Sequence, residues 1–518
     1  MKLNIRKEFV MKQLVKLLTL VLACLMLVSS FVACGDTVDT EAGAKDTEGN
    51  LQETESETEA DEYVKDDVPA DLRFDGETVT FFTRDDTEAW LYEMDCDTIM
   101  NDTLYDAIYY RNKTVEERLG VTITTIHQKG SNNNAGAWND AYRVAVNNKT
   151  GDFDAAAMYT SQGSVLAVEG IFYNAVDFPY ISLDKPWWNQ SLREELTLFN
   201  TLYFLAGDIT ISQITCGEAL FYNKDLMDKY FPDGEVDLYQ VVEDKKWTID
   251  YMYDLVSQVH EDLDGSGTVT DGDVVGFLDG DFASNGEANR DAWIAACGIK
   301  ITEMVGGMPE YSFYSTRTVN AFEKVKRLNQ SPGTLCLSYP ETTKFENGNV
   351  LFDMDRLRAG STFRTMANRY GVLPLPMYEE NQEGGYKTVV FNGASMATIP
   401  SSLADERKDV VGATLELMAA ESYRQVRPAY CEVALKTKYS EDPKDAAMYD
   451  LIIDSFQYNF GYIYSTKSLG GVGALFRNLG NDIAQKWDEN DEVYQEKLNE
   501  LIDGLDEASF IANYGGAS

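Results

Sequence analysis

The chain is poor in basic residues, and this shortage excludes two classes of function. It has 44 lysines and arginines against 86 aspartates and glutamates, which gives a formal net charge of −42. Proteins that bind nucleic acid or an anionic membrane surface need basic side chains opposite the phosphates. A neutral or cationic ligand is easier for this chain to accommodate than an anionic one. The charge says little about the fold.

Histidines and catalytic motifs are also scarce. The only histidines are His127, at the end of a predicted strand, and His260, at the end of a predicted helix. Residues 393–397 lack the final glycine of a nucleophile elbow. There is no phosphate-binding loop, and residues 471–473 lack the third glycine of a dinucleotide motif. A glycoside hydrolase needs only two carboxylates, so the sequence leaves that activity open.

Cysteines are few and widely spaced, and no C-x-x-C occurs, so neither a zinc site nor a disulfide framework is indicated. One of the cysteines, Cys34, lies in the N-terminal segment.

In that segment, basic residues precede an apolar run over 17–28, which is typical of a secretory signal and too short for a membrane span. The residues before Cys34 resemble the lipobox of bacterial lipoproteins, although Phe31 stands where leucine is usual. The resemblance implies that residues 1–33 are a signal peptide and that Cys34 is lipidated.

Two alternatives to this reading stay open. The segment could be an ordinary signal peptide with an incidental cysteine, and Met11 could be the true start. Residues 34–68 are predicted to be the lipidated cysteine and a disordered tether, because 35–67 contain 13 acidic and 2 basic residues among small polar ones. A free-standing acidic tail is the other interpretation of that segment.

The remaining body of about 450 residues has room for two domains and is predicted to be α/β. Strands are expected at 77–83, 121–126 and 153–158, with helices at 102–119 and 138–148 between them, which predicts a parallel sheet. Gly120 is a natural helix C-cap. Further strands are expected at 202–206, 219–222, 350–354, 371–375 and 394–399, and 403–507 should be mostly helical.

From about Leu72 onward the chain resembles the extracellular solute-binding proteins of bacterial ABC importers, in the carbohydrate-type group. The segments that carry this resemblance are 106–120, 185–190, 202–208, 220–226, 392–395, 419–423 and 428–437. The resemblance implies a two-lobed periplasmic-binding-protein-like fold of type II, with an interlobe cleft and a helical C-terminal part. Lobe one would be 72–218 plus 376–425, and lobe two 222–372 plus 428–515. Closure around the ligand would be a hinge motion.

The same resemblance implies a lipid-anchored monomer on the outer face of the cell membrane. It would deliver a neutral solute, expected to be an oligosaccharide, to ABC permease subunits, without enzymatic activity. The alternatives are a cell-surface glycoside hydrolase and a surface adhesion protein that contains a structural calcium ion.

A sugar site needs aromatic faces flanked by polar side chains. Such residues fall near predicted strand ends and lobe crossings, although each could instead have a structural role. The candidates are Trp90, Asp208, Tyr222, Asn223, Trp293, Asp355, Asn392 and Tyr430.

Residues 262–273 resemble an EF-hand or dockerin calcium loop, with oxygen-bearing side chains at alternate positions and Gly267 at the sharp turn. The expected ligands of one structural Ca²⁺ are Asp262, Asp264, Ser266, Asp273 and the carbonyl of Thr268. An acidic, glycine-rich turn without metal is the alternative.

Overall fold

The first sheet follows directly from the alternation of apolar residues in the N-terminal half of the body. In the computed structural model its strands are β1 (Thr78–Arg84), β2 (Thr122–Gln128), β3 (Ala155–Tyr159) and β13 (Ser395–Thr398), in the order β13-β3-β1-β2. β1 pairs in parallel with β2 and β3, and β13 runs antiparallel to β3. Every residue of β3 is buried. The predicted parallel βαβ arrangement is confirmed.

Helix α3 (Thr103–Leu119) connects the first two strands, and its ends follow known capping rules. The Asp102 carboxylate accepts hydrogen bonds from the backbone N–H groups of Leu104 and Tyr105 at 3.0 and 3.1 Å. Gly120 ends the helix in the left-handed region at φ 70°, which a glycine adopts without strain. The predicted helix and its C-cap are confirmed.

A second, mixed sheet occupies the middle of the chain. Its strands are β4 (Glu218–Asn223), β5 (His260–Glu261), β6 (Val274–Gly280), β9 (Thr334–Leu337), β10 (Val350–Arg356) and β11 (Tyr370–Leu373). The order is β11-β4-β10-β6-β5, with β9 also paired to β6. β10 runs antiparallel to β4 and parallel to β6. His260, expected to end a helix, lies instead in β5, where it pairs with Val275.

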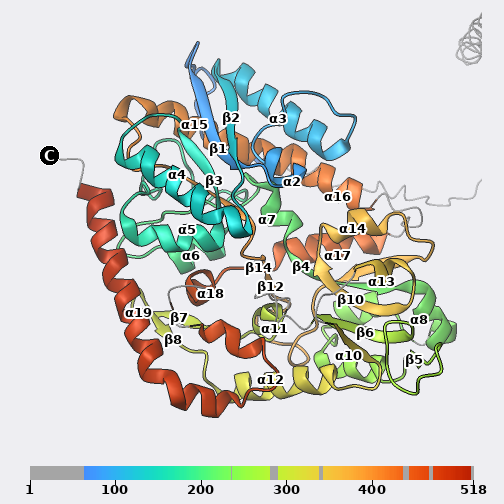
Figure 1. Cartoon of the computed structure of the whole chain (residues 1–518). Coiled ribbons are helices and arrows are strands. Elements are labelled where there is room, and N and C mark those ends of the chain that lie inside the picture. The colour runs from blue at the N-terminus through green and yellow to red at the C-terminus, as the bar shows by residue number, and fades with distance from the viewer. Residues whose placement is uncertain are drawn as a thin grey trace, which may run out of the picture. The chain divides into compact units, whose positions relative to one another are not determined.

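Helices surround both sheets (Figure 1). The remaining helices are α2 (Glu88–Leu91), α4 (Ala135–Asn147), α5 (Thr160–Leu166), α6 (Gln190–Leu196), α7 (Ile211–Thr215), α8 (Lys224–Tyr230), α9 (Leu238–Glu243), α10 (Ile249–Val256), α11 (Asp291–Ala296), α12 (Thr316–Asn329), α13 (Thr342–Glu346), α14 (Ala359–Phe363), α15 (Lys408–Glu421), α16 (Arg427–Leu435), α17 (Pro443–Asp454), α18 (Phe460–Ser465) and α19 (Ile483–Tyr514). The short strands are β7 (Thr302–Val305), β8 (Met308–Tyr311), β12 (Thr388–Val389) and β14 (Phe456–Gln457).

Three chain segments pair with one another between the two sheets. Gly217 forms an antiparallel bridge with Val390, and β12 pairs in parallel with β14. The N–H of Phe391 donates to the carbonyl of Cys216 at 2.9 Å. Figure 1 shows β12 and β14 between the sheets, beside the start of β4. A π-helix over Ser422–Val426 joins α15 to α16, close to the predicted boundary between the lobe segments 376–425 and 428–515.

One expected strand is absent. Residues 202–206 form a single isolated bridge, in which Leu205 and Ala397 exchange backbone hydrogen bonds of 2.9 and 2.8 Å. The alternation of apolar residues there marks an extended, buried segment. However, the backbone of Leu202 donates to Asn174, and the carbonyl of Ala206 accepts from Asn189, so no ladder forms.

The structure describes residues 64–234, 236–280, 290–337, 342–435, 443–465, 469 and 471–514. The predicted signal peptide, Cys34 and nearly all of the predicted tether lie outside these residues. Residues 65–68, which the sequence assigned to the tether, belong with the unit formed by Lys65–Ser518. Asp66 accepts hydrogen bonds from Arg118 at 2.7 and 2.9 Å, and from Arg424 at 3.2 Å. Within the described ranges, the helices are too short or too polar to cross a membrane.

Candidate functional site

The carboxyl edge of the first sheet holds a buried arginine between two aromatic rings. β1 ends at Arg84 and β3 at Tyr159, and parallel strands bring these ends to one edge. The Arg84 guanidinium lies 4.0 Å from the ring centre of Trp90 and 4.6 Å from that of Tyr159. It donates to the carbonyl of Gly393 at 2.9 Å and to Ser395 Oγ at 2.7 Å. Arg84 is 2% exposed, so these contacts hold it in one geometry.

The corresponding edge of the second sheet holds a buried carboxylate and an arginine. β4 begins at Glu218, and antiparallel β10 ends at Arg356 directly opposite it. Arg356 Nε lies 3.5 Å from Glu218 Oε1, and its guanidinium lies 3.5 Å from the ring centre of Phe391. Burial raises the pKa of Glu218 to about 7, although Arg356 opposes the shift. Among the described residues, Glu218 Oε2 is buried and has no hydrogen-bond partner, which is costly for a polar atom.

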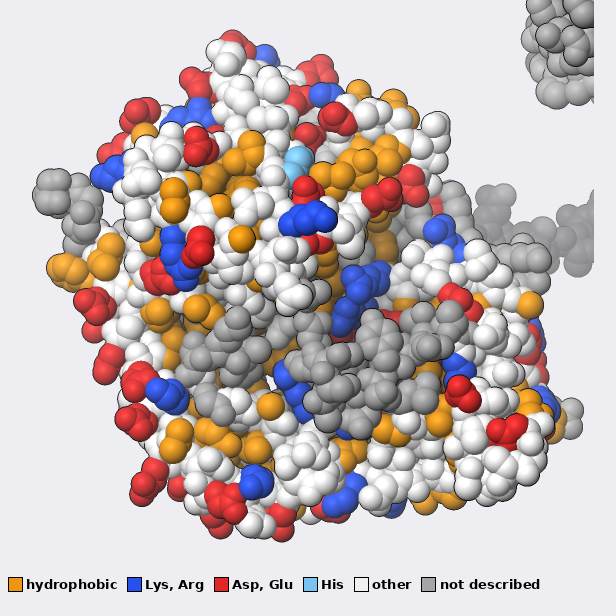
Figure 2. Space-filling view, in the orientation of Figure 1, with side chains coloured by type: hydrophobic (Ala, Val, Ile, Leu, Met, Phe, Trp, Pro, Cys, Tyr) orange, Lys and Arg blue, Asp and Glu red, His pale blue; other side chains and the backbone are white. Residues whose placement is uncertain are grey.

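Charged groups from both edges surround Cys216, at the crossing. Burial raises the pKa of its thiol, and Arg358, Arg356, Glu93 and Arg84 are all close enough to influence that pKa. Glu93 is itself buried, which raises its pKa, and it accepts a hydrogen bond from the Ser212 hydroxyl. Figure 2 shows basic side chains near the centre of the visible face, and both acidic and basic ones around its rim. The facing edges of the sheets therefore form a polar site with aromatic walls.

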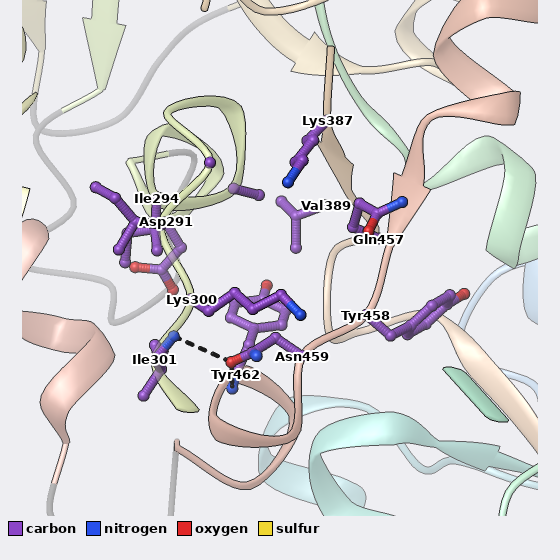
Figure 3. A pocket seen from close by; sticks show the side chains of 13 residues that line it. Asp291, Ile294, Lys300, Ile301, Lys387, Val389, Gln457, Tyr458, Asn459 and Tyr462 are labelled. Atoms are coloured by element: carbon purple, nitrogen blue, oxygen red, sulfur yellow. Dashed lines mark hydrogen bonds between the residues drawn. The ribbon is translucent and has the colours of Figure 1, made fainter. Parts of the chain in front are cut away.

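A pocket lies beside these edges, between α11, the crossing strands and α18 (Figure 3). Its space is about 490 Å³ when counted out to the open solvent. The residues that line it are Asp291, Ile294, Ala295, Gly298, Ile299, Lys300, Ile301, Lys387, Val389, Gln457, Tyr458, Asn459 and Tyr462. Burial, and then the nearby carboxylates of Asp291 and Glu218, raise the pKa of Tyr462. The pocket is thus close to the Glu218 edge.

Hydrogen bonds fix much of this lining. Asn459 Oδ1 accepts from the N–H of Ile301 at 3.1 Å, drawn dashed in Figure 3, and its Nδ2 donates to the carbonyl of Thr302 at 2.7 Å. Lys300 Nζ lies 2.6 Å from Glu195 Oε1. Arg477 Nε donates to both carboxylate oxygens of Asp291, at 2.9 and 3.1 Å.

Some of the candidate residues from the sequence lie at this site. Trp90 forms one wall of the Arg84 sandwich. The carbonyl of Asn392, beside Gly393, accepts from the N–H of Ser161 at 3.1 Å. Asp355 precedes Arg356 on β10, but alternation along the strand turns its side chain to the opposite face of the sheet.

Other candidates have structural surroundings. Asn223 lies at the far end of β4, roughly 16 Å from Glu218 along the strand. Its side chain caps α8 through hydrogen bonds of 3.0 Å from the N–H groups of Asp225 and Leu226. Tyr222 contacts the ring of Tyr239 edge-on.

The last three candidates, which are also buried, are Trp293, Tyr430 and Asp208. Trp293 is 1% exposed within α11, and Tyr430 is buried in α16. Burial raises the pKa of Asp208 to about 7, with Arg427 nearby opposing the shift. A direct ligand contact by any of the eight candidates stays a prediction.

Sequence reasoning missed Arg84, Glu218, Arg356, Phe391 and the pocket lysines. The available signal was the position of Arg84 and Glu218 immediately at the ends of predicted strands 77–83 and 219–222. Neither Arg84 nor Glu218 was among the eight candidates predicted from the sequence.

The proposed calcium loop brings three carboxylates together. One oxygen each from Asp262, Asp264 and Asp273 lie within 4.8 Å of one another, which matches two ligands at about 2.3–2.6 Å on either side of one ion. Gly267 has φ 74°, as the sharp turn requires. Hydrogen bonds from Thr270 and Ser266 lower the pKa of Asp264 to about 2. The metal itself stays a prediction.

The sequence matches no protein-family model and no curated protein sequence. Solved structures do resemble it. One is a cyclo/maltodextrin-binding protein complexed with maltotetraose, with TM-score 0.50 and 12% identity over 83% of this chain and 96% of that one. Another is the GacH receptor of Streptomyces glaucescens, also solved with acarbose, with TM-score 0.48 and 13% identity over 84% and 98% of the two chains. The first likeness shows the fold. The expected α/β fold of the periplasmic-binding-protein type, with its helical C-terminal part, is confirmed.

The raised pKa of Glu218 predicts a pH dependence of stability. Its ordinary value is 4.5 and its folded value is about 7, so the folded protein holds this proton more tightly and loses stability as pH rises between those values. The buried carboxyls Asp208 and Glu416 act in the same direction. Glu218→Gln should therefore reduce the loss of unfolding free energy between pH 4.5 and 7.5 by up to about 3 kcal/mol.

Urea unfolding across that pH range measures the effect. Glu310→Gln, at an exposed position, is the matched control and should leave the slope unchanged. Equal slopes for wild type and Glu218→Gln would show that Glu218 does not hold its proton in the folded state.

Proposed function

We propose that this protein captures an oligosaccharide and presents it to the permease subunits of an ABC importer, acting as a monomer. The observation that supports this most is the pair of facing sheet edges, with Arg84 between Trp90 and Tyr159 on one side and Glu218 beside Arg356 on the other. The fold shared with a maltodextrin-binding protein points the same way.

The chemistry of these edges suits a sugar. A sugar ring has flat C–H faces, which contact aromatic rings, and hydroxyl groups, which both donate and accept hydrogen bonds. Arg84 and Arg356 offer donors, and Glu218 Oε2 offers an acceptor. A buried carboxylate oxygen without a partner is costly, so a sugar hydroxyl that donates to it gains more than it would in water.

The crossing segments provide a hinge for capture. The segments that connect the sheets pair through few backbone hydrogen bonds, so the sheets can approach each other as rigid bodies. A ligand that binds the closed form stabilises it by RT ln(1 + [L]/Kd), about 2.7 kcal/mol at a hundredfold excess over Kd.

The alternative of a cell-surface glycoside hydrolase gains no support from the fold, since the matched protein is a binding protein. Incubation with the best-binding glycan for a day, followed by chromatography, tests it. Cleaved product far in excess of protein would replace the proposed function with hydrolysis.

Substitution at the Arg84 sandwich should weaken sugar binding. We expect Trp90→Ala to raise the Kd for the best glycan of a thermal-shift screen about tenfold, because a stacked aromatic contributes directly to affinity. Thr248→Ala is the control: Thr248 caps α10 by accepting a hydrogen bond from the N–H of Tyr251 at 3.2 Å, so its loss should cost about 1 kcal/mol of stability and leave Kd unchanged.

Isothermal titration gives Kd for both variants, and urea unfolding gives their stability. An unchanged Kd in Trp90→Ala, or a loss of binding in Thr248→Ala at unchanged Trp90→Ala affinity, would place the ligand elsewhere.

Calcium binding at 262–273 is a separate proposal. Chelation should lower the melting temperature without abolishing sugar binding, because the metal would join residues of one loop only. Differential scanning calorimetry with and without chelator measures the shift, and Asp262→Asn should mimic chelation. An unchanged melting curve, with no metal by mass spectrometry, would contradict the proposal.

We also propose that Cys34 carries lipid and anchors the protein at the outer face of the cell membrane. The lipobox-like sequence before it supports this. Cys34→Ala should release the protein from the membrane fraction, whereas Cys24→Ala, inside the signal, should not. Retention of Cys34→Ala in washed membranes would disprove lipid anchoring.

A further inference from the structure

We propose that the pocket between α11, β12, β14 and α18 receives a carboxylate of the bound sugar, as in a uronic acid, and that Lys387 selects it. This inference rests on the proposed function, because it names the kind of sugar that the same site takes. It depends on one lysine in the pocket whose charge is not paired.

Lys387 directs its ammonium group into the pocket. It lies one residue before β12, and Figure 3 shows its side chain entering the space next to Val389. Residues two apart on an extended strand face the same side, so Lys387 and Val389 line one wall together. The side chain is half-buried.

The other charged side chains of the lining are paired. Asp291 is held by Arg477 through two hydrogen bonds, and Lys300 is held by Glu195 at 2.6 Å. Lys387, by contrast, makes no ion pair or hydrogen bond with any described residue. The opposite charges within each of these pairs cancel, so the ammonium group of Lys387 is the one uncompensated charge among the described lining residues.

The surroundings disfavour that charge while the pocket lacks an anion. Burial, and then the positive charges of Lys300 and Arg317, lower the pKa of Lys387, while the carboxylates of Glu383 and Glu195 oppose the shift more weakly. A half-buried ammonium without a counter-ion loses hydration and gains little in return. A carboxylate in the pocket would compensate for the lost hydration of the ammonium group through a charge-assisted hydrogen bond, which is about twice as strong as a neutral one.

The strongly negative composition predicted a neutral solute, and Lys387 changes that expectation at one position. Charges on the protein surface act over a Debye length of about 8 Å at physiological ionic strength, so most of the acidic side chains are screened from the pocket. Groups within a few ångströms decide which ligand charge the pocket accepts. Among the charged residues that line the pocket and their ion-pair partners, the net charge is positive.

Matched sugar pairs test the inference. Each pair consists of two oligosaccharides of the same linkage that differ only at C6 of one residue, where a hydroxymethyl group is replaced by a carboxylate. Isothermal titration measures both members against wild type, Lys387→Gln, Lys387→Arg and the control Lys246→Gln, an exposed lysine beside Asp244. Melting curves without sugar verify that each variant is folded.

We expect the acidic member of at least one pair to bind wild type about tenfold more tightly than the neutral member. Lys387→Gln should remove this preference and change the affinity for the neutral member less than about twofold. Lys387→Arg and Lys246→Gln should keep the preference. If Lys387→Gln is unfolded, Lys387→Met takes its place, because methionine fits the same space without charge.

The possible failures are distinguishable. If neutral sugars bind and the acidic members show no advantage, or if the advantage survives in Lys387→Gln, the inference is wrong and the proposed function stands. If neither member of any pair binds, the proposed function falls and the inference with it.

Discussion

The site depends on the pairing of three chain segments between the two sheets. Gly217 pairs with Val390 while the adjoining β12 pairs with β14, and together these pairings form a small ribbon beside Glu218 and Phe391. A Cβ on Gly217 would lie 2.5 Å from the Phe456 ring, so only glycine permits the approach. The ribbon places Glu218 at the first position of β4 and Phe391 opposite Arg356. It also directs Lys387 and Val389 into the neighbouring pocket.

Near that ribbon lie ionisable side chains whose charged forms are disfavoured by burial. Arg84, Glu93 and Glu218 are each no more than 2% exposed, and burial alone shifts the pKa of each toward its neutral form. Well-packed apolar residues would be at least as stable in such places. Buried ionisable groups with strongly shifted pKa values gather at functional sites, where a ligand completes their hydrogen bonds. The aromatic rings beside Arg84 and Arg356 supply apolar contact to the same groups.

The sequence predicted the elements better than the site. The strands of the first sheet, α3 and its caps could be read from periodicity and local chemistry, because those signals involve residues near one another in the chain. Glu218 and Arg356 come together through the antiparallel register of β4 and β10, which no local pattern reveals. Asn223 shows the same limit. It was chosen because it lies near a crossing, but β4 runs away from the crossing and carries Asn223 to the opposite edge, where it caps α8.

In the second sheet, strand direction places the proposed calcium loop and the Glu218 edge at opposite ends. The acidic loop at 262–273 connects β5 to the start of β6, and parallel β6 and β10 both run from that side toward the Glu218 edge. β6 has seven residues, so its start lies roughly 20 Å from its carboxyl end. Asp273 is fully buried and accepts hydrogen bonds from the N–H groups of Leu263 and Thr270, so it closes the loop onto the sheet. An ion held there would fix the pairing of β5 with β6 without contacting a sugar at the other edge.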